Sequence, residues 1–168
     1  ELKFNLGLVL QQQGGKKGIQ QAFDFLEEVA NAPDAGGYRQ SALFQLARIH
    51  HGRQDYEEAL TTYTDVIAEL SGKPEADIAR FEVGIVERDR ESWQRAVDEF
   101  RKVGSDSPLY SRSRLEAGQL LVRHGELEKA IAMLQEGLAG KTPSESVALF
   151  NYLLGVDQLE MVATLLLD

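Results

Sequence analysis

The three histidines are the side chains best suited to catalysis or metal binding, and their spacing fits neither role. His50 and His51 are adjacent, so on a helix they point to different sides, while His124 falls at a predicted turn. Metal ligands on a helix instead recur three or four residues apart on one face. His50 lies on the apolar side of its predicted helix and is interpreted as a packed core residue. No catalytic residue, metal ligand or cofactor is predicted, and the chain is not expected to be an enzyme.

Two other patterns could indicate chemistry but favour a structural role. Residues 14–18, GGKKG, lack the spacing of a phosphate-binding loop and do not follow a strand, so they are predicted to form a turn. Tyr56 and Trp93 could stack on nucleic-acid bases, but they occupy the same position in two sequence repeats, which favours core packing. Acidic pairs such as Glu57-Glu58 are expected to form a solvated helix face.

The composition excludes several classes of function. The 168 residues include 18 Lys and Arg against 27 Asp and Glu, a net charge of −9, which argues against nucleic-acid binding. There is no cysteine, so disulfides and a cysteine nucleophile are excluded. The longest nearly apolar stretch, 161–167, is too short to span a bilayer. The chain starts at Glu1 without a visible signal peptide and is expected to be a fragment, so the sequence leaves the compartment, cytoplasm or bacterial periplasm, undecided.

Four segments of similar pattern show that the chain is built from repeats. An alanine anchors each segment, at steps of 37, 37 and 34 residues: Ala22, Ala59, Ala96 and Ala130. Large apolar residues recur three positions before each alanine and at fixed positions after it, which places one apolar stripe on a helix. A second stripe lies twelve and thirteen residues upstream. Each repeat is therefore predicted to contain two amphipathic helices, helix A followed by helix B.

Small residues and prolines support this division. In the last three repeats a small residue lies twelve positions before the alanine, at Ala47, Gly84 and Gly118, and lets the two helices approach closely. Repeat 1 departs from the pattern, with Leu10 at this position. All four prolines follow a predicted helix B, where a proline can start the next helix. The turn between the helices of repeat 3, residues 89–92, contains no glycine, unlike the other repeats.

These features resemble the tetratricopeptide repeat (TPR) family. The resemblance rests on the 34-residue step, the four alanines, and the following residues: Tyr56, Gly84, Trp93, Pro108 and Gly118. It implies an all-α fold, a right-handed superhelix of antiparallel helix pairs called an α-solenoid. An ordinary helical bundle and a helix-pair solenoid of another period are the alternatives.

The resemblance also implies the domain layout. The whole chain, 1–168, is expected to form a single TPR-like domain. Its repeats are expected at 3–39, 40–76, 77–110 and 111–143, with a degenerate fifth pair or cap at 144–168. In the last part, residues 142–145 read as a capping box and residues 157–167 as a second helix.

In such superhelices the A helices line the concave face, so A-helix residues off the core stripe are candidates for a partner-binding groove. They are Phe44, Gln45, Arg48 and His51 in repeat 2, Phe81, Ile85 and Arg88 in repeat 3, and Arg112, Leu115 and Gln119 in repeat 4. The large apolar members are expected to form a strip, and the arginines to add positive charge. Such a groove suits an amphipathic helix or an extended apolar peptide with acidic groups.

One TPR subclass grips the carboxylate of chaperone peptides with Lys and Asn side chains in this groove. The corresponding positions in this sequence hold other residues: Gly7, Phe44, Gln45, Phe81 and Leu115. Membership of that subclass is therefore not expected.

The sequence thus predicts a non-enzymatic scaffold for protein–protein interaction and complex assembly, without nucleic-acid partners or a membrane span. Residues 106–110 give a faint resemblance to bacterial TPR proteins of the cell envelope. Two alternatives stay open. The apolar segments 6–10 and 161–167 would allow copies to associate end to end, or the chain would be the docking domain of a larger enzyme.

Overall fold

The computed structural model describes residues 1–139 and 149–155, and all the regular secondary structure within them is helical. The helices are α1 (Leu2–Gln13), α2 (Lys16–Asn31), α3 (Gly37–Gly52), α4 (Tyr56–Glu69), α5 (Ala76–Asp89), α6 (Trp93–Arg101), α7 (Tyr110–Arg123) and α8 (Leu127–Ala139). Residues 149–155 are also helical. The all-α fold expected from the sequence is confirmed.

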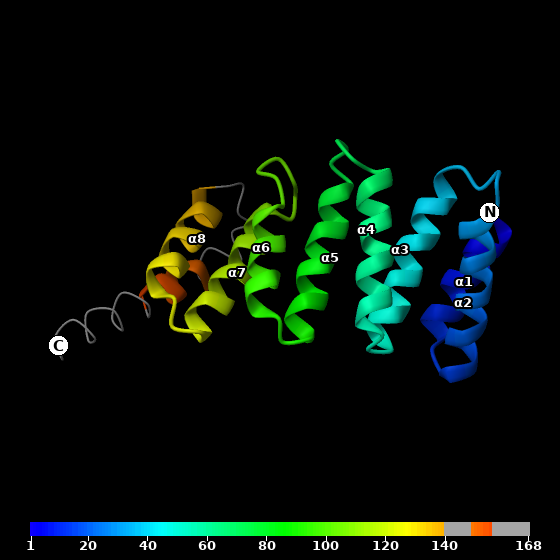
Figure 1. The fold of residues 1–168 in the computed structure, drawn as a ribbon, viewed down its shortest axis with the longest axis horizontal. Coiled ribbons are helices and arrows are strands. Elements are labelled where there is room, and N and C mark those ends of the chain that lie inside the picture. Colours follow the sequence, from blue (N-terminus) through cyan, green and yellow to red (C-terminus); the bar gives the residue numbers. More distant parts are fainter. Residues whose placement is uncertain (140–148, 156–168) are drawn as a thin grey trace. The chain divides into compact units, whose positions relative to one another are not determined.

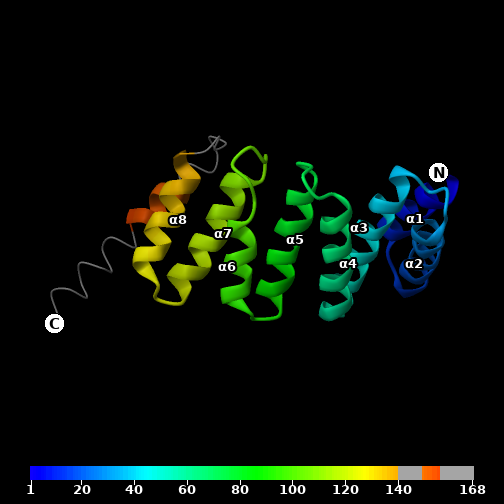
Figure 2. The same cartoon turned by 45° about the horizontal axis from the view of Figure 1, so that its top comes forward.

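The chain divides into two compact units, one spanning Glu1–Gly72 and the other beginning at Lys73. Within each unit, consecutive helices pack as antiparallel neighbours (Figure 1), and a second view shows the same pairing (Figure 2). Unit 1 contains the pairs α1–α2 and α3–α4, and unit 2 contains α5–α6 and α7–α8. The helix pairs of the four predicted repeats are thus present, whereas a single domain over 1–168 stays a prediction.

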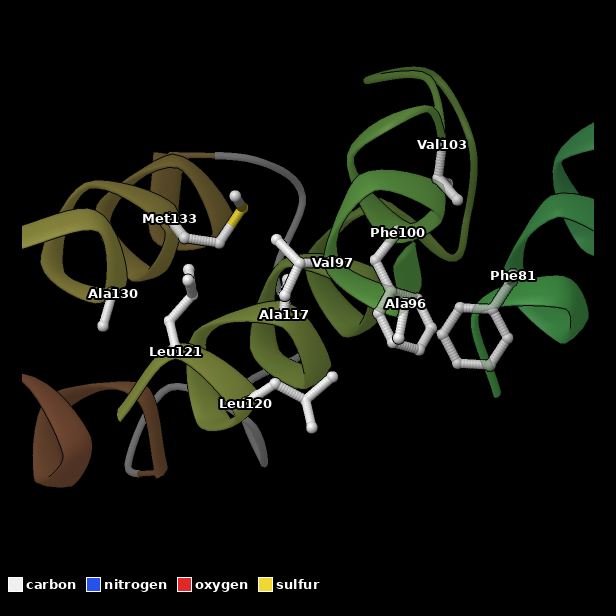
Figure 3. Packing of buried hydrophobic residues seen from close by; sticks show 10 residues of the cluster. All are labelled: Phe81, Ala96, Val97, Phe100, Val103, Ala117, Leu120, Leu121, Ala130 and Met133. Atoms are coloured by element: carbon white, nitrogen blue, oxygen red, sulfur yellow. The ribbon is translucent and has the colours of Figure 1, made fainter. Parts of the chain in front are cut away.

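Each unit has its own apolar core, formed where a helix B packs between two A helices. The four anchoring alanines are fully buried. In unit 1, Leu26 of α2 packs with Leu46 and Ile49 of α3. In unit 2, Phe100 of α6 packs with Leu120 of α7 in a cluster that extends to α8 (Figure 3). The apolar stripes predicted from the spacing are therefore the faces that hold the helices together.

Close approach of the helices explains the small residues of helix A. A Cβ atom added to Gly84 would lie 2.6 Å from Cε1 of Phe100, and one added to Gly118 would lie 2.5 Å from Cδ2 of Leu134. Carbon atoms in contact are normally more than about 3.5 Å apart. Each glycine thus admits a large side chain of the facing helix B.

Repeat 1 follows the same rule, but with a different register from the one expected. Gly7, not Leu10, is the small residue, because a Cβ atom at Gly7 would lie 3.0 Å from Cγ of Leu26. The physical reason is the length of α2, which begins six residues before Ala22, whereas the later B helices begin three residues before their alanines. The three extra residues, nearly a full turn, move every equivalent residue of α1 three positions upstream. Residues 16–18 accordingly belong to the first turn of α2, and only Gly14 and Gly15 form the turn.

The connections between repeats contain prolines where the sequence predicts them. Pro33, Pro74 and Pro108 each lie after a helix B and before the next helix A. The 37-residue repeats have longer B helices, since α2 and α4 have 16 and 14 residues and α6 has 9, and a longer connection after α6 offsets part of that difference. Pro143, the capping box at 142–145 and the helix expected at 157–167 lie outside the described residues.

The turns between helices A and B of repeats 2 to 4 share one backbone geometry. Gln54, Glu91 and Gly125 are left-handed, with φ of 66°, 65° and 74°. In each turn the next N–H donates to the carbonyl five residues upstream, at 2.9, 2.8 and 2.9 Å. This is the hydrogen-bonding pattern of a Schellman motif, whose left-handed residue is usually glycine. In repeat 2 the glycine seen in the sequence, Gly52, ends α3 instead, so Gln54 takes the left-handed position.

We expect Glu91→Gly to stabilise unit 2 by about 0.5–1 kcal/mol, because glycine is not strained in the left-handed conformation. Gln54→Gly should have the same effect in unit 1 without changing the charge. Urea denaturation followed by circular dichroism measures both. The control is Arg95→Gly in α6, where glycine should destabilise the helix by about 0.5–1 kcal/mol. A loss of stability in both turn variants would show that the left-handed turns are not strained.

Candidate partner-binding surface

In unit 1 the predicted groove residues lie on α3, and the packing of Phe44 anchors them to the core. The ring of Phe44 contacts that of Tyr63 edge-on, with centroids 5.4 Å apart and planes at 73°. Tyr63 of α4 is fully buried. Phe44 is itself half-buried, so one side of its ring forms part of the surface.

Polar residues flank Phe44 on the same helix. Gln45 and His51 are half-buried, and the His51 ring lies 6.1 Å from that of Tyr56. Arg48 is exposed and has no ion-pair partner among the residues that the structure describes. The charge of Arg48 is thus available to a ligand.

The register of repeat 1 adds α1 to this surface. Phe4 is the residue equivalent to Phe44, three positions before the small residue, and it is half-buried. Its ring lies 5.6 Å from that of Tyr38 at the start of α3, which connects the two A helices of unit 1. The spacing from Ala22 puts Gly7 at this position, so Phe4 is not among the residues predicted from the sequence. The signal that could have found it is the glycine itself, since Gly7 is the small residue that α1 contains near its middle.

In unit 2 the structure corrects the expectation for Phe81. This side chain is only 4% exposed, and its ring lies 5.4 Å from that of Phe100 (Figure 3). Gly84 is one turn further along α5, and the Phe100 ring that it admits covers Phe81 as well. Phe81 is therefore a core residue and not a groove-lining one.

The other predicted residues of unit 2 lie on α5 and α7. Ile85, Leu115 and Gln119 are half-buried and leave part of their side chains at the surface. Arg112 is exposed, and its guanidinium lies 5.0 Å from the centroid of the Phe81 ring. Arg112 has no ion-pair partner within the described ranges. This face of unit 2 thus combines partly exposed apolar groups with an available positive charge.

Arg88 differs from Arg112, because acidic neighbours already neutralise its charge. One Nη atom lies 2.8 Å from Oε2 of Glu116 on α7, and the other lies 3.0 Å from Oδ1 of Asp89. Partial burial alone would lower the pKa of Arg88, but the hydrogen bonds and charges of Asp89 and Glu116 raise it above the ordinary value. Arg88 is therefore charged and links α5 to α7. From the sequence Arg88 was expected to add positive charge to the groove, and this bridge was not predicted.

The structure brings the predicted residues together on two faces, one in each unit. Unit 1 presents the face of α1 and α3 around Phe4, Phe44 and Arg48. Unit 2 presents the face of α5 and α7 around Ile85 and Arg112, with its neighbours Leu115 and Gln119. A continuous groove across both units stays a prediction.

The side chains first considered for chemistry are packed against aromatic rings. The ring of His50 contacts Phe23 edge-on at 5.2 Å, and His124 stacks on Trp93 at 4.3 Å. Within the described ranges, no group of three or more His, Asp or Glu side chains could hold a metal ion. No helix in that part of the chain is long and apolar enough to cross a membrane.

Solved structures of other proteins have a similar helix-pair architecture. The fold is similar to that of the MamA RS-1 ArsTM double mutant, with a TM-score of 0.70 and 19% identity over 95% of this chain and 83% of that one. It is also similar to the putative kinesin light chain TPR-like repeats of Podosopora anserina, with a TM-score of 0.66 and 19% identity over 92% of this chain and 83% of the other. A thermophilic TPR protein of Thermus thermophilus gives a TM-score of 0.55 and 20% identity over 95% and 81% of the two chains.

Sequence comparison identifies the family directly. No curated protein sequence matches the chain. The model of a family described as tetratricopeptide repeat matches residues 44–108 and 90–146, which together are more than half of the chain. Such repeats are generally non-catalytic and typically serve as protein-interaction scaffolds. The chain therefore belongs to the tetratricopeptide repeat family.

Proposed function

We propose that this protein is a non-catalytic scaffold that binds a protein partner through its A-helix faces. One observation supports this most strongly, in a chain with a net charge of −9. Arg112 is exposed over the Phe81 ring, on the same helix as the half-buried Leu115, and has no ion-pair partner among the described residues. Arginine beside apolar groups is a combination enriched at binding hot spots. Arg48 beside Phe44 gives unit 1 a similar face.

The proposed partner is an amphipathic helix or an extended apolar peptide that contains acidic groups. Its apolar side chains would cover the exposed parts of Ile85 and Leu115, and its carboxylates would pair with Arg112. Most of the chain repels acidic ligands because of its negative charge, so an acidic peptide would be attracted mainly where arginines are unpaired. The charge also predicts that binding weakens as the salt concentration rises.

A peptide selection tests this function. Peptides selected from a random library against the wild-type chain are expected to contain leucine or phenylalanine together with Asp or Glu. Arg112→Glu should weaken the selected peptide by about 10-fold or more, because an attraction becomes a repulsion. Isothermal titration calorimetry measures the affinities.

The matched control is Arg95→Glu, which makes the same charge change at an exposed site on the B helix α6. Its affinity should stay within about 2-fold of wild type, apart from the small effect of net charge. Equal loss of affinity in both variants, or no loss in either, would contradict binding at the α5–α7 face. Thermal melting of both variants confirms that they are folded.

A further inference from the structure

Helix α5 presents one stripe of residues that the core does not bury. Successive intervals of four, three and four residues place its members on one face of the helix. They are Ile78, Glu82, Ile85 and Asp89, which we call the α5 stripe. The two outer members are exposed and the two inner ones are half-buried, whereas the neighbouring Phe81 and Val83 are buried.

Helix α7 presents a stripe with the same spacing. It consists of Arg112, Glu116, Gln119 and Arg123, which we call the α7 stripe. Two side-chain contacts connect the helices: the guanidinium of Arg112 lies 5.0 Å from the centroid of the Phe81 ring, and an Nη atom of Arg88 lies 2.8 Å from Oε2 of Glu116. The two stripes therefore belong to one surface of unit 2.

One carboxylate of the α5 stripe lacks a partner. Arg88 already pairs with Glu116 and with Asp89. Glu82 has no hydrogen bond or ion pair with any residue that the structure describes, although it is half-buried. A carboxylate that loses hydration without gaining a hydrogen bond is destabilised, and a cationic group of a ligand would restore the lost interaction. Glu82 is thus a negative charge available to a ligand.

The available charges of the α7 stripe have the opposite sign. Arg112 and Arg123 are both exposed, and neither has an ion-pair partner in the described part of the chain. They are eleven residues apart, about 16 Å along the helix. The surface therefore has a basic edge along α7 and an acidic edge along α5.

We propose that the occupant of this surface is an amphipathic helix with acidic side chains on one edge of its apolar face and a basic side chain on the other. The basic side chain pairs with Glu82, and the acidic ones pair with Arg112 and Arg123. The apolar face covers the exposed parts of Ile78 and Ile85. A helix suits this surface because its own side chains recur at the same intervals of three and four residues.

This charge pattern rests on the proposed function and narrows the class of partner. A helix with acidic side chains on both edges would place one of them against Glu82, so such a partner is selected against. The pattern also fixes the direction of the bound helix, because turning the helix end to end would bring its acidic edge to α5.

A library of helical peptides tests the charge pattern. Each peptide has the length of α7, 14 residues, with leucines along one face and Glu, Lys or Gln at every position on the two edges beside that face. Selection against the wild-type chain should enrich peptides with Glu on one edge and Lys on the other. Selection against Glu82→Lys should instead enrich Glu on both edges.

Isothermal titration calorimetry of a selected two-edged peptide tests the role of Glu82. Glu82→Lys should weaken binding by about 10-fold or more, because an attraction becomes a repulsion. Glu82→Gln, which keeps the side-chain volume, should weaken it by about 3-fold. Replacing the peptide lysine by Gln should have little further effect in Glu82→Gln, as a double-mutant cycle requires.

The matched control is Glu128→Lys, the same charge change at an exposed site on the B helix α8. Its affinity should stay within about 2-fold of wild type. Thermal melting by circular dichroism confirms that the variants are folded. A nitroxide spin label at one end of the peptide should broaden the NMR signal of either Arg112 or Arg123, and broadening of both would contradict a fixed direction.

The results that overturn the charge pattern differ from those that overturn the scaffold function. Peptides that need Arg112 but bind wild type and Glu82→Lys equally would reject the pattern and leave the scaffold function intact. Equal loss in Glu82→Lys and Glu128→Lys would do the same. If the random library described above gives binders and the helical library gives none, the partner is not an amphipathic helix. If neither library gives a binder, the proposed function fails as well.

Discussion

Arg114→Met is expected to destabilise unit 2 by about 3 kcal/mol or more, because it removes the hydrogen bonds that Arg114 donates to carbonyl groups at the end of α6. Arg114 is 6% exposed. Its guanidinium donates to the carbonyls of Phe100, Arg101 and Val103 at 2.7, 3.1 and 3.3 Å. These carbonyls belong to the last residues of α6 and the turn after it, where a helix supplies few backbone donors. Of the three, the Phe100 carbonyl also accepts from the N–H of Val103, at 3.4 Å.

The length of α6 explains why this arginine matters. At nine residues, α6 is the shortest of the helices α1 to α8, and the carbonyls at its end are covered by α7. Arg114 of α7 therefore caps the C-terminal end of α6 and links α6 to the next repeat. Methionine keeps most of the side-chain volume, so the loss would come mainly from the hydrogen bonds, with a smaller part from the contact of the guanidinium with the Tyr110 ring at 4.3 Å.

Urea denaturation monitored by the fluorescence of Trp93 measures this effect in unit 2. Arg123→Met, at an exposed position of the same helix, is the control and should change stability by less than about 0.5 kcal/mol. Glu136→Gln separates the ion pair from the carbonyl contacts. Since Glu136 is half-exposed, its loss should cost less than about 1 kcal/mol. A large effect of Glu136→Gln with a small effect of Arg114→Met would contradict this explanation.

Gly84→Leu should also destabilise unit 2, by about 3 kcal/mol, because α5 and α6 are too close for a side chain at this position. A Cβ atom there would lie within 2.9 Å of three atoms of the Phe100 ring. That ring is fully buried and also covers Phe81, so it cannot move aside without opening the core.

Gly52→Leu is the matched control for this substitution. Gly52 is helical, and a Cβ atom placed on it would meet nothing within 4 Å. Leucine has a higher helix propensity than glycine, so this variant should be as stable as wild type or more stable. If Gly84→Leu is equally well tolerated, the contact between α5 and α6 is looser than the structure shows.

The sequence predicts the helices well because their pattern depends on local spacing. Three features recur with the repeats. The anchoring alanines and the small residues Gly84 and Gly118 mark close contacts between helices, and the prolines mark the connections between repeats. Repeat 1 was misaligned because α2 starts three residues, nearly a full turn, earlier than the other B helices, and in the sequence only Gly7 marks that difference. The close approach of Gly7 to Leu26 shows that this glycine takes the place of the small residue in repeat 1.

The surface was harder to predict, because exposure depends on contacts between neighbouring helices. Phe81 and Leu115 hold equivalent positions, but only Phe81 is buried, since the large ring of Phe100 reaches it. Arg88 and Arg112 look alike in the sequence, and Glu116 neutralises only the first. Helical spacing gives the side of the helix on which a residue lies but not the length of the side chains that face it.

The most direct test of the proposed function is to map a selected acidic peptide on the protein by NMR. Titration of the peptide into isotope-labelled chain should shift the backbone amide signals of Ile85, Arg112, Leu115 and Gln119 in unit 2. Signals from the exposed sides of α6 and α8 should stay in place. Shifts confined to α6 and α8 would place the binding site on the B helices and contradict a scaffold that binds through its A-helix faces.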